Sequence, residues 1–174
     1  NATAVLAEHL GADLSTITNE IDKLMLIIKK GEPITTKLIE HHIGISKDYN
    51  VFELQNALAI KDIVKANRII NYFSENTKSH HIVPILSSLF SFFQKVMIYH
   101  FIKDKDSKTV ASTLKINPFF IRQYQNAAQH YDTTKLFSIF RYLKEYDLRS
   151  KGINNKSTKQ NGLLKELTFK ILQS

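Results

Sequence analysis

The 174-residue chain contains no cysteine and no tryptophan, and it has only five glycines and three prolines. Without cysteine there is no disulfide framework, no thiolate zinc site, no iron–sulfur cluster and no thiol nucleophile. The scarcity of glycine and proline, together with 43% hydrophobic residues, argues against a disordered or collagen-like chain. It also argues against an all-β sandwich, which needs many turns.

The motifs of common catalytic sites are missing as well. No glycine is followed by lysine, so the chain has no Walker-type phosphate loop, and it has no G-x-S-x-G serine elbow. The adjacent pairs His41-His42 and His80-His81 point to different helix faces and lack the i, i+4 spacing that brings two imidazoles to one metal. We therefore expect no catalytic residue, no metal site and no cofactor, and we expect that this chain is not an enzyme by itself.

Apolar residues recur at helical spacing along almost the whole chain. The first stripe is Leu14, Ile17, Ile21, Leu24 and Ile28, whose intervals of three and four residues place them on one helix face. Further stripes, each with a plausible capping residue or first-turn proline, predict helices that begin near Thr35, Asn50, Asp62, Pro84, Asn117 and Thr133, and a last helix around residues 164–171. No stretch of useful length alternates as a strand does, so the predicted fold is all-α.

The most apolar stretch, residues 82–102, is interrupted at its middle by Gln94 and Lys95. Because a lysine at the centre of a bilayer costs about 2.5–3.5 kcal/mol, we interpret this stretch as a buried core helix and expect no membrane segment. The chain begins at Asn1 and shows no signal-peptide pattern, so we expect a fragment or a processed product.

The net charge of +8 is unevenly distributed. Residues 1–46 hold four lysines and six acidic residues, whereas residues 47–174 hold 20 basic and 10 acidic residues. The change falls in the polar segment 44–48, which predicts a boundary between a small domain, 1–46, and a larger one, 47–174. The excess positive charge of the larger domain points to an anionic partner.

Two segments are candidates for nucleic-acid binding. The first contains four cations with no acidic residue between them: Arg149, Lys151, Lys156 and Lys159. Each phosphate that they neutralised would add salt-dependent affinity for DNA, although a solvated loop would have the same composition.

The second segment is residues 107–131, where a short helix, a tight turn and a second helix resemble a helix-turn-helix. Its second helix carries Arg122 as the sole strongly basic side chain among several carboxamides. A helix-turn-helix DNA-binding regulator is therefore an alternative function for the chain.

Five short segments, in order along the chain, carry a resemblance to a known family. They are T-N-E-I-D-K-L at 18–24, N-V-F-E-L-Q-N-A-L at 50–58, K-A-N-R-I at 65–69, L-K-I-N-P-F at 114–119 and D-L-R-S-K-G at 147–152. The motif residues are Asn19, Glu20, Lys23, Leu24, Phe52, Leu54, Asp147, Lys151 and Gly152. In this order the segments resemble the delta subunit of bacterial DNA polymerase III, a component of the clamp loader.

The resemblance implies a lid-like helical domain of an AAA+ module at 1–46 and a helical collar domain of five to seven helices at 47–174. It implies a cytoplasmic scaffold subunit that assembles through its collar with delta-prime and gamma/tau and takes part in loading the sliding clamp on primed DNA. Contact with the clamp would belong to an N-terminal AAA+-like domain outside this chain. Gly11-Ala-Asp-Leu14 lacks the arginine of ATP-hydrolysing relatives, and no aromatic residue lies between Tyr146 and Phe169, where relatives can carry one near the DNA junction.

Phenylalanine is abundant, with 11 residues in the chain. Phe90, Phe92 and Phe93 fall on different sides of one predicted helix, so they cannot all enter the same core face. We therefore expect one edge of the larger domain to be an assembly surface.

Overall fold

The computed structural model describes residues 14–28, 31–35, 38–39, 49–77, 80–155 and 157–174. The chain divides into two compact units, Asn1–Asn50 and Val51–Ser174. The boundary predicted after residue 46 lies outside the described residues, and so does Ile43 of the short helix predicted after Thr35. Throughout the described ranges the regular structure is helical, which confirms the all-α prediction.

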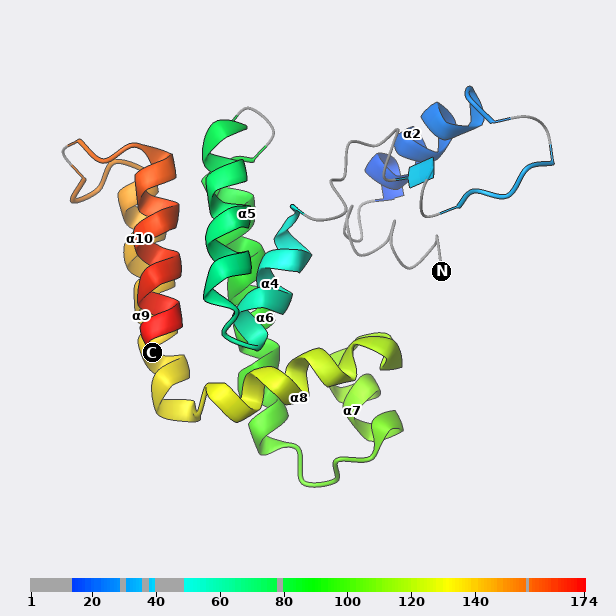
Figure 1. Cartoon of the computed structure of the whole chain (residues 1–174). Coiled ribbons are helices and arrows are strands. Elements are labelled where there is room, and N and C mark those ends of the chain that lie inside the picture. The colour runs from blue at the N-terminus through cyan, green and yellow to red at the C-terminus, as the bar shows by residue number, and fades with distance from the viewer. Residues whose placement is uncertain (1–13, 29–30, 36–37, 40–48, 78–79, 156) are drawn as a thin grey trace. The chain divides into compact units, whose positions relative to one another are not determined.

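In the first unit, helix α2 spans Leu14–Met25 (Figure 1). It ends one turn earlier than the apolar stripe suggested, and Gly31 follows with a φ of +96°. Within the stripe Leu24 is fully buried, whereas Leu14 is 77% exposed. The Thr35 hydroxyl accepts a hydrogen bond from the backbone N–H of Leu38, as expected of the predicted cap.

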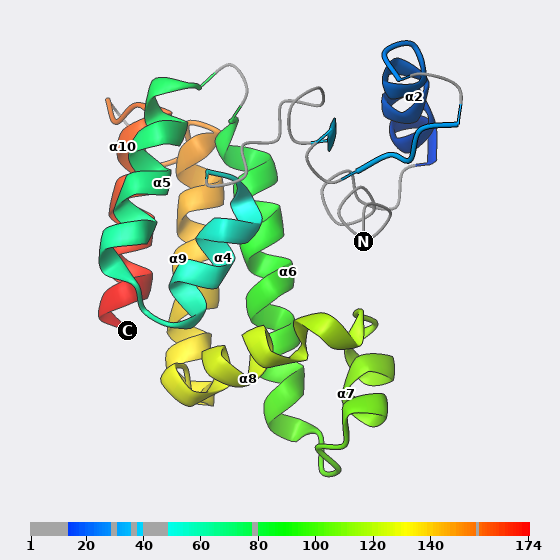
Figure 2. The same ribbon diagram turned by 45° about the vertical axis from the view of Figure 1, so that its right-hand side comes forward.

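The described residues of the second unit form seven α-helices and one short 3-10 helix. They are α4 (Val51–Ala59), α5 (Ile63–Glu75), α6 (Ile82–Phe101), α7 (Ser107–Leu114), η1 (Pro118–Phe120), α8 (Ile121–His130), α9 (Thr133–Ser150) and α10 (Gln160–Gln173). Helices α5, α6, α9 and α10 run along one another, and α7 and α8 lie across one end of α6 (Figures 1 and 2).

Local sequence explains where several of these helices begin. Aspartates at positions 62, 106 and 132 precede α5, α7 and α9, and each accepts a hydrogen bond from a backbone N–H of the first turn. Asn117 does the same for η1, and Pro84 lies in the first turn of α6. These caps satisfy N–H groups that would otherwise lack partners at a helix start.

Helix α6 is the centre of the unit, in contact with α4, α7, α8, α9 and α10. By length and composition alone it could cross a membrane. Its buried side chains, however, form the core of the unit: Ile82, Ile85, Leu86, Leu89, Phe92, Phe93 and Val96. This packing agrees with the predicted core helix.

An aromatic cluster fixes α8 on α6. The ring of Phe92 lies 5.3 Å from Tyr124, and the ring of Phe93 meets Tyr131 edge-on at 5.4 Å. Such ring pairs add about 0.5–1.5 kcal/mol each beyond their burial. The Tyr131 hydroxyl also donates a 2.9 Å hydrogen bond to the carbonyl oxygen of Leu58, which ties the end of α8 to α4.

Candidate assembly and DNA-binding surfaces

The predicted DNA-binding cations lie at and after the end of α9, which turns into the loop that leads to α10. Gly152 ends this turn with a φ of +86°, a conformation that favours glycine and accounts for this residue of the family motif. The Asn155 side chain holds the loop, because its amide donates to the carbonyls of Arg149 and Thr158, at 3.2 and 2.8 Å, and its oxygen accepts from the Thr158 N–H. Lys156 lies outside the described residues.

Arg149 is engaged by its own domain. Its Nη1 lies 2.8 Å from Glu166 Oε2 and 3.7 Å from Glu145 Oε1, and its guanidinium is 4.8 Å from the Tyr146 ring centroid. Burial lowers the pKa of Arg149, but the hydrogen bonds and charges of Glu166 and Tyr146 together outweigh that effect and leave the pKa above its ordinary value. With 17% of the side chain exposed, this guanidinium has little left to offer a phosphate.

The two lysines of this segment differ from each other. Lys151 Nζ lies 2.7 Å from Asp147 Oδ2, so these two motif residues form an exposed i, i+4 ion pair. Lys159 is exposed at the N-cap position of α10 and forms no ion pair within the described ranges. That these cations bind DNA stays a prediction, and of the three that the structure describes Lys159 is the best placed to do so.

The remaining motif residues have structural roles or solvent exposure. Lys23 pairs with Glu20 at 2.6 Å along α2, Asn19 is exposed, and Leu24 is buried. In α4, Leu54 is fully buried and Phe52 is half-buried.

A second surface is an apolar groove of about 280 Å³ between α6 and α9. Phe90 of α6 and Phe140 of α9 face each other across it, with ring centroids 5.5 Å apart. Phe90 is 47% exposed, and Phe137, one turn before Phe140, is 70% exposed. Lys144 and Asp147 form the charged rim of the groove, which gives it the apolar centre and polar edge typical of a protein–protein interface.

The three phenylalanines singled out from the sequence do separate in the structure. Phe92 and Phe93 are buried in the core, whereas Phe90 turns to the α6–α9 groove. Leu136, Ile139, Phe140 and Leu143 recur at helical spacing, which predicts Phe140 in the core stripe of this helix and does not include Phe137. A cluster of large apolar residues on the polar side of a helical wheel would have been the available signal.

The predicted helix-turn-helix segment forms α7, a turn and α8. The turn is made by Lys115, which has a φ of +52° and whose N–H is bonded to carbonyls at the end of α7. The outward face of α8 presents Arg122 with the carboxamides Gln125, Asn126 and Gln129.

The second unit matches a family described as DNA polymerase III delta subunit, C-terminal domain, over residues 48–167. The chain therefore belongs to this family. It is also 28% identical over 150 residues to DNA polymerase III subunit delta of Bacillus subtilis (strain 168), a match that covers 83% of this chain and 43% of that protein.

The solved structure of the Bacillus subtilis DNA clamp loader delta protein has a similar fold. The TM-score is 0.67 at 22% identity, over 99% of this chain and 50% of that one. The chain thus spans about half the length of the relatives that it matches. The family assignment favours the clamp-loader hypothesis over the regulator hypothesis.

Proposed function

We propose that this chain is the C-terminal part of a clamp-loader delta subunit and acts as a non-catalytic assembly scaffold in the cytoplasm. Residues 1–46 would be the lid of an AAA+ module and residues 47–174 the collar. The collar would join delta-prime and gamma/tau, and the assembled complex would load the sliding clamp on primed DNA. Contact with the clamp would belong to an N-terminal domain that this chain does not include.

The α6–α9 groove is the observation that supports assembly most directly. Phe90 and Phe137 expose large apolar areas on neighbouring helices of one unit, and the Phe90–Phe140 ring pair gives the surface a defined shape. Covering such rings with a partner subunit removes apolar area from water at about 25 cal/mol per Å². We therefore assign this groove to the neighbouring collar of the loader.

A pair of double variants tests this assignment. Phe90→Asp puts a charge into the groove, and Phe137→Asp puts a second charge on the exposed surface one turn before Phe140. We expect affinity for purified delta-prime and gamma/tau to fall at least about tenfold. The control, Phe101→Asp with Phe119→Asp, changes two phenylalanines that are at least as exposed but lie outside the groove.

Size-exclusion chromatography with light scattering, performed on the chain mixed with the partner subunits, measures the outcome. The control variant should co-elute with the partners as the unchanged chain does. Equal assembly of both double variants would rule out the α6–α9 groove as the contact, and no assembly of the unchanged chain would contradict the scaffold function itself.

DNA contact would come from the loop after α9. Replacing Lys159 by alanine should remove one phosphate contact and lower the slope of log affinity against log salt by about 0.7–0.9. Arg149→Ala should leave that slope unchanged, because its guanidinium already pairs with Glu166. Primed DNA titrated at several salt concentrations gives both slopes.

A further inference from the structure

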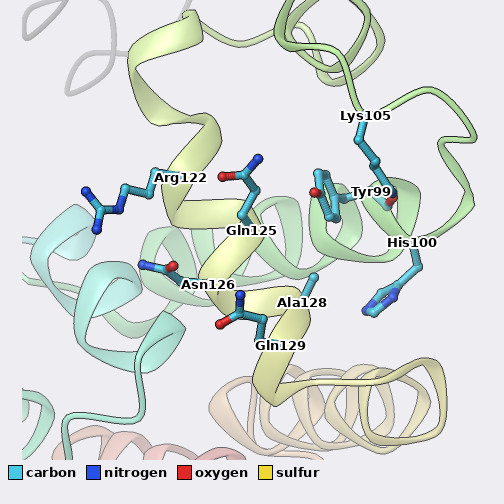
Figure 3. Close-up of a pocket in the computed structure, with 8 residues that line it drawn as sticks. All are labelled: Tyr99, His100, Lys105, Arg122, Gln125, Asn126, Ala128 and Gln129. Carbon is cyan, nitrogen blue, oxygen red and sulfur yellow. The ribbon is translucent and has the colours of Figure 1, made fainter.

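A polar groove of about 620 Å³ lies between α8 and the end of α6 (Figure 3). One wall is α8, where Arg122, Gln125, Asn126 and Gln129 line the groove, and the other wall is formed by Tyr99 and Lys105. Figure 3 shows the Gln125 side chain on the side of α8 that faces Tyr99, while Arg122 and Asn126 project from the opposite side. No carboxylate lines this groove.

The side chains of the α8 wall have no partners in the described part of the chain. Arg122, Gln125, Asn126 and Gln129 form neither a hydrogen bond nor an ion pair there, although Gln125 and Asn126 are half-buried. Together they offer five guanidinium donors and three carboxamides, each with two donors and one acceptor. By contrast, the side-chain amide of the buried Gln55 in α4 donates to Ser88 Oγ at 2.9 Å.

The opposite wall is held in place by its own contacts. Lys105 Nζ donates to the carbonyl oxygen of Tyr99 and lies 3.8 Å from the centroid of the Tyr99 ring. His100 Nε2 lies 2.8 Å from the carbonyl oxygen of Tyr131, which joins this wall to the end of α8. An ammonium has three donors, so Lys105 keeps two of them for a ligand.

Two exposed aromatic residues lie close in the sequence to residues of these walls, although neither lines the groove itself. Phe101, next to His100, is 72% exposed, and Phe119, three residues before Arg122, is 83% exposed. A nucleobase can stack on the face of such an exposed ring, and each stacked base contributes about 1–3 kcal/mol to the binding free energy.

We propose that the α8 groove binds single-stranded nucleic acid. Arg122 and Lys105 would contact phosphates, the three carboxamides would meet the donors and acceptors of base edges, and Phe101 and Phe119 would offer stacking surfaces. The exposed rings favour a single strand over a duplex, because the bases of a duplex are already stacked on one another. An acidic peptide needs the cations alone and leaves the carboxamides and rings without a role.

This site goes beyond the proposed function and stands apart from the predicted DNA contact. The α8 groove lies before the start of α9, and the cationic loop follows the end of α9, 18 residues further along that helix. Each surface can therefore be changed without the other.

The test uses fluorescence anisotropy of the whole chain with labelled oligo-dA of roughly 20 nucleotides, a length that covers at least one ordinary single-strand site. The groove variant combines Gln125→Glu, Asn126→Asp and Gln129→Glu, which keeps side-chain shape and adds three negative charges. The control variant combines Asn67→Asp, Asn71→Asp and Gln173→Glu, which adds the same charge at three exposed carboxamides outside the groove.

We expect the groove variant to bind oligo-dA at least about tenfold more weakly than the control variant, with the same thermal midpoint. A further pair, Phe101→Ala and Phe119→Ala, should weaken binding without any change of charge. Parallel titrations with oligo-rA separate DNA from RNA as the ligand, and preference for either one supports the site.

Three results would overturn the proposal. The first is equal affinity of the groove and control variants for oligo-dA. The second is tighter binding of a blunt duplex or of a polyglutamate peptide at the groove than of the single strand. The third is loss of oligo-dA binding on Lys159→Ala but not in the groove variant, which would support the loop as the DNA contact and leave the α8 groove without a ligand.

Discussion

Two fully buried tyrosines anchor the two ends of α9 in different ways. Tyr131, just before α9, donates to a neutral backbone carbonyl, that of Leu58, and burial raises its pKa above the ordinary value. Tyr146, near the end of α9, donates to the Glu166 carboxylate at 3.1 Å. Burial raises the pKa of Tyr146 too, against a lowering influence of Lys170 and with a further rise from Glu166.

The difference decides which charged side chains remain available. At the Tyr131 end the anchor is neutral, and Arg122, Gln125, Asn126 and Gln129 of α8 form no hydrogen bond or ion pair within the described residues. At the Tyr146 end Glu166 also holds Arg149, while Lys170 lies 3.5 Å from Glu145 and about 5.0 Å from the Tyr146 ring. Arg149 and Lys170 at the Tyr146 end are therefore paired with carboxylates, whereas Arg122 in α8 forms no ion pair within the described residues.

The largest expected effect on stability concerns Tyr131, whose hydroxyl donates to a neutral backbone carbonyl. Tyr131→Ala should lower the free energy of unfolding by about 3–5 kcal/mol, because it leaves a cavity beside Phe93. Tyr131→Phe keeps the ring and should cost only about 1 kcal/mol for the lost hydrogen bond. Urea unfolding measures both, and equal losses in the two variants would show that the hydrogen bond, not the ring, carries the anchor.

The second prediction compares the stability and the oligo-dA affinity of alanine variants at two arginines, Arg149 and Arg122. Arg149→Ala should destabilise the chain by about 1 kcal/mol, since it breaks a partly exposed pair, and should leave oligo-dA affinity unchanged. Arg122→Ala should leave the free energy of unfolding within about 0.5 kcal/mol and weaken oligo-dA binding several-fold. Urea unfolding and anisotropy on both variants give the four values. A variant that changed stability and binding together would break the contrast between the two ends of α9.

The third prediction concerns pH. The ring of His80 stacks on Phe73 at 4.4 Å, and burial lowers the pKa of His80. Protonation of His80 therefore favours the unfolded chain. The contribution of neutral His80 to stability is complete above the ordinary pKa of about 6.5 and is lost as the pH falls below 6.5.

His80→Phe keeps the stacking and removes the titration. The variant should lose less stability than the unchanged chain between pH 7 and pH 5, by under about 1 kcal/mol. His81→Gln, at the exposed neighbour, serves as the control and should follow the unchanged chain. Urea unfolding at both pH values measures the loss of stability in each protein. Equal losses in all three proteins would exclude His80 as the titrating group.

The smallest effect is expected at the surface pair after α9. Lys151→Ala removes its contact with Asp147 and should change the free energy of unfolding by no more than about 0.5 kcal/mol. Urea unfolding in low and high salt tests this, since screening should erase even that difference. A loss above 1 kcal/mol in high salt would mean that Lys151 supports the loop through packing rather than charge.

Much of the fold was accessible from local patterns. The caps at Asp62 and Asn117 and the long apolar helix containing Pro84 are found where the sequence predicts them. These features depend on residues within one or two turns of each other, which is why spacing alone predicts them. The family motif was likewise readable, because its segments keep their order along the chain.

The candidate sites were less accessible. The i, i+4 spacing of Glu145 and Arg149 indicates one ion pair, but the closer partner, Glu166, lies 17 residues away and meets Arg149 only because α10 packs on α9. Phe140 has the spacing of a core residue, yet it packs against Phe90 of α6 and lines the α6–α9 groove. The spacing of residues within one helix does not predict which residues of another helix they contact.

The sequence by itself determined the helices, the absence of motifs for catalysis, and the location of the positive charge after residue 46. Only the tertiary structure decided which of those charges are free. A guanidinium and a carboxylate pair favourably when helix packing brings them together, as it does for Arg149 and Glu166 at 2.8 Å. No carboxylate lines the α8 groove, so Arg122 has no such partner there. The count of cations in the sequence therefore predicts an anionic partner, and the packing of α8 and α10 decides which of the described cations are unpaired.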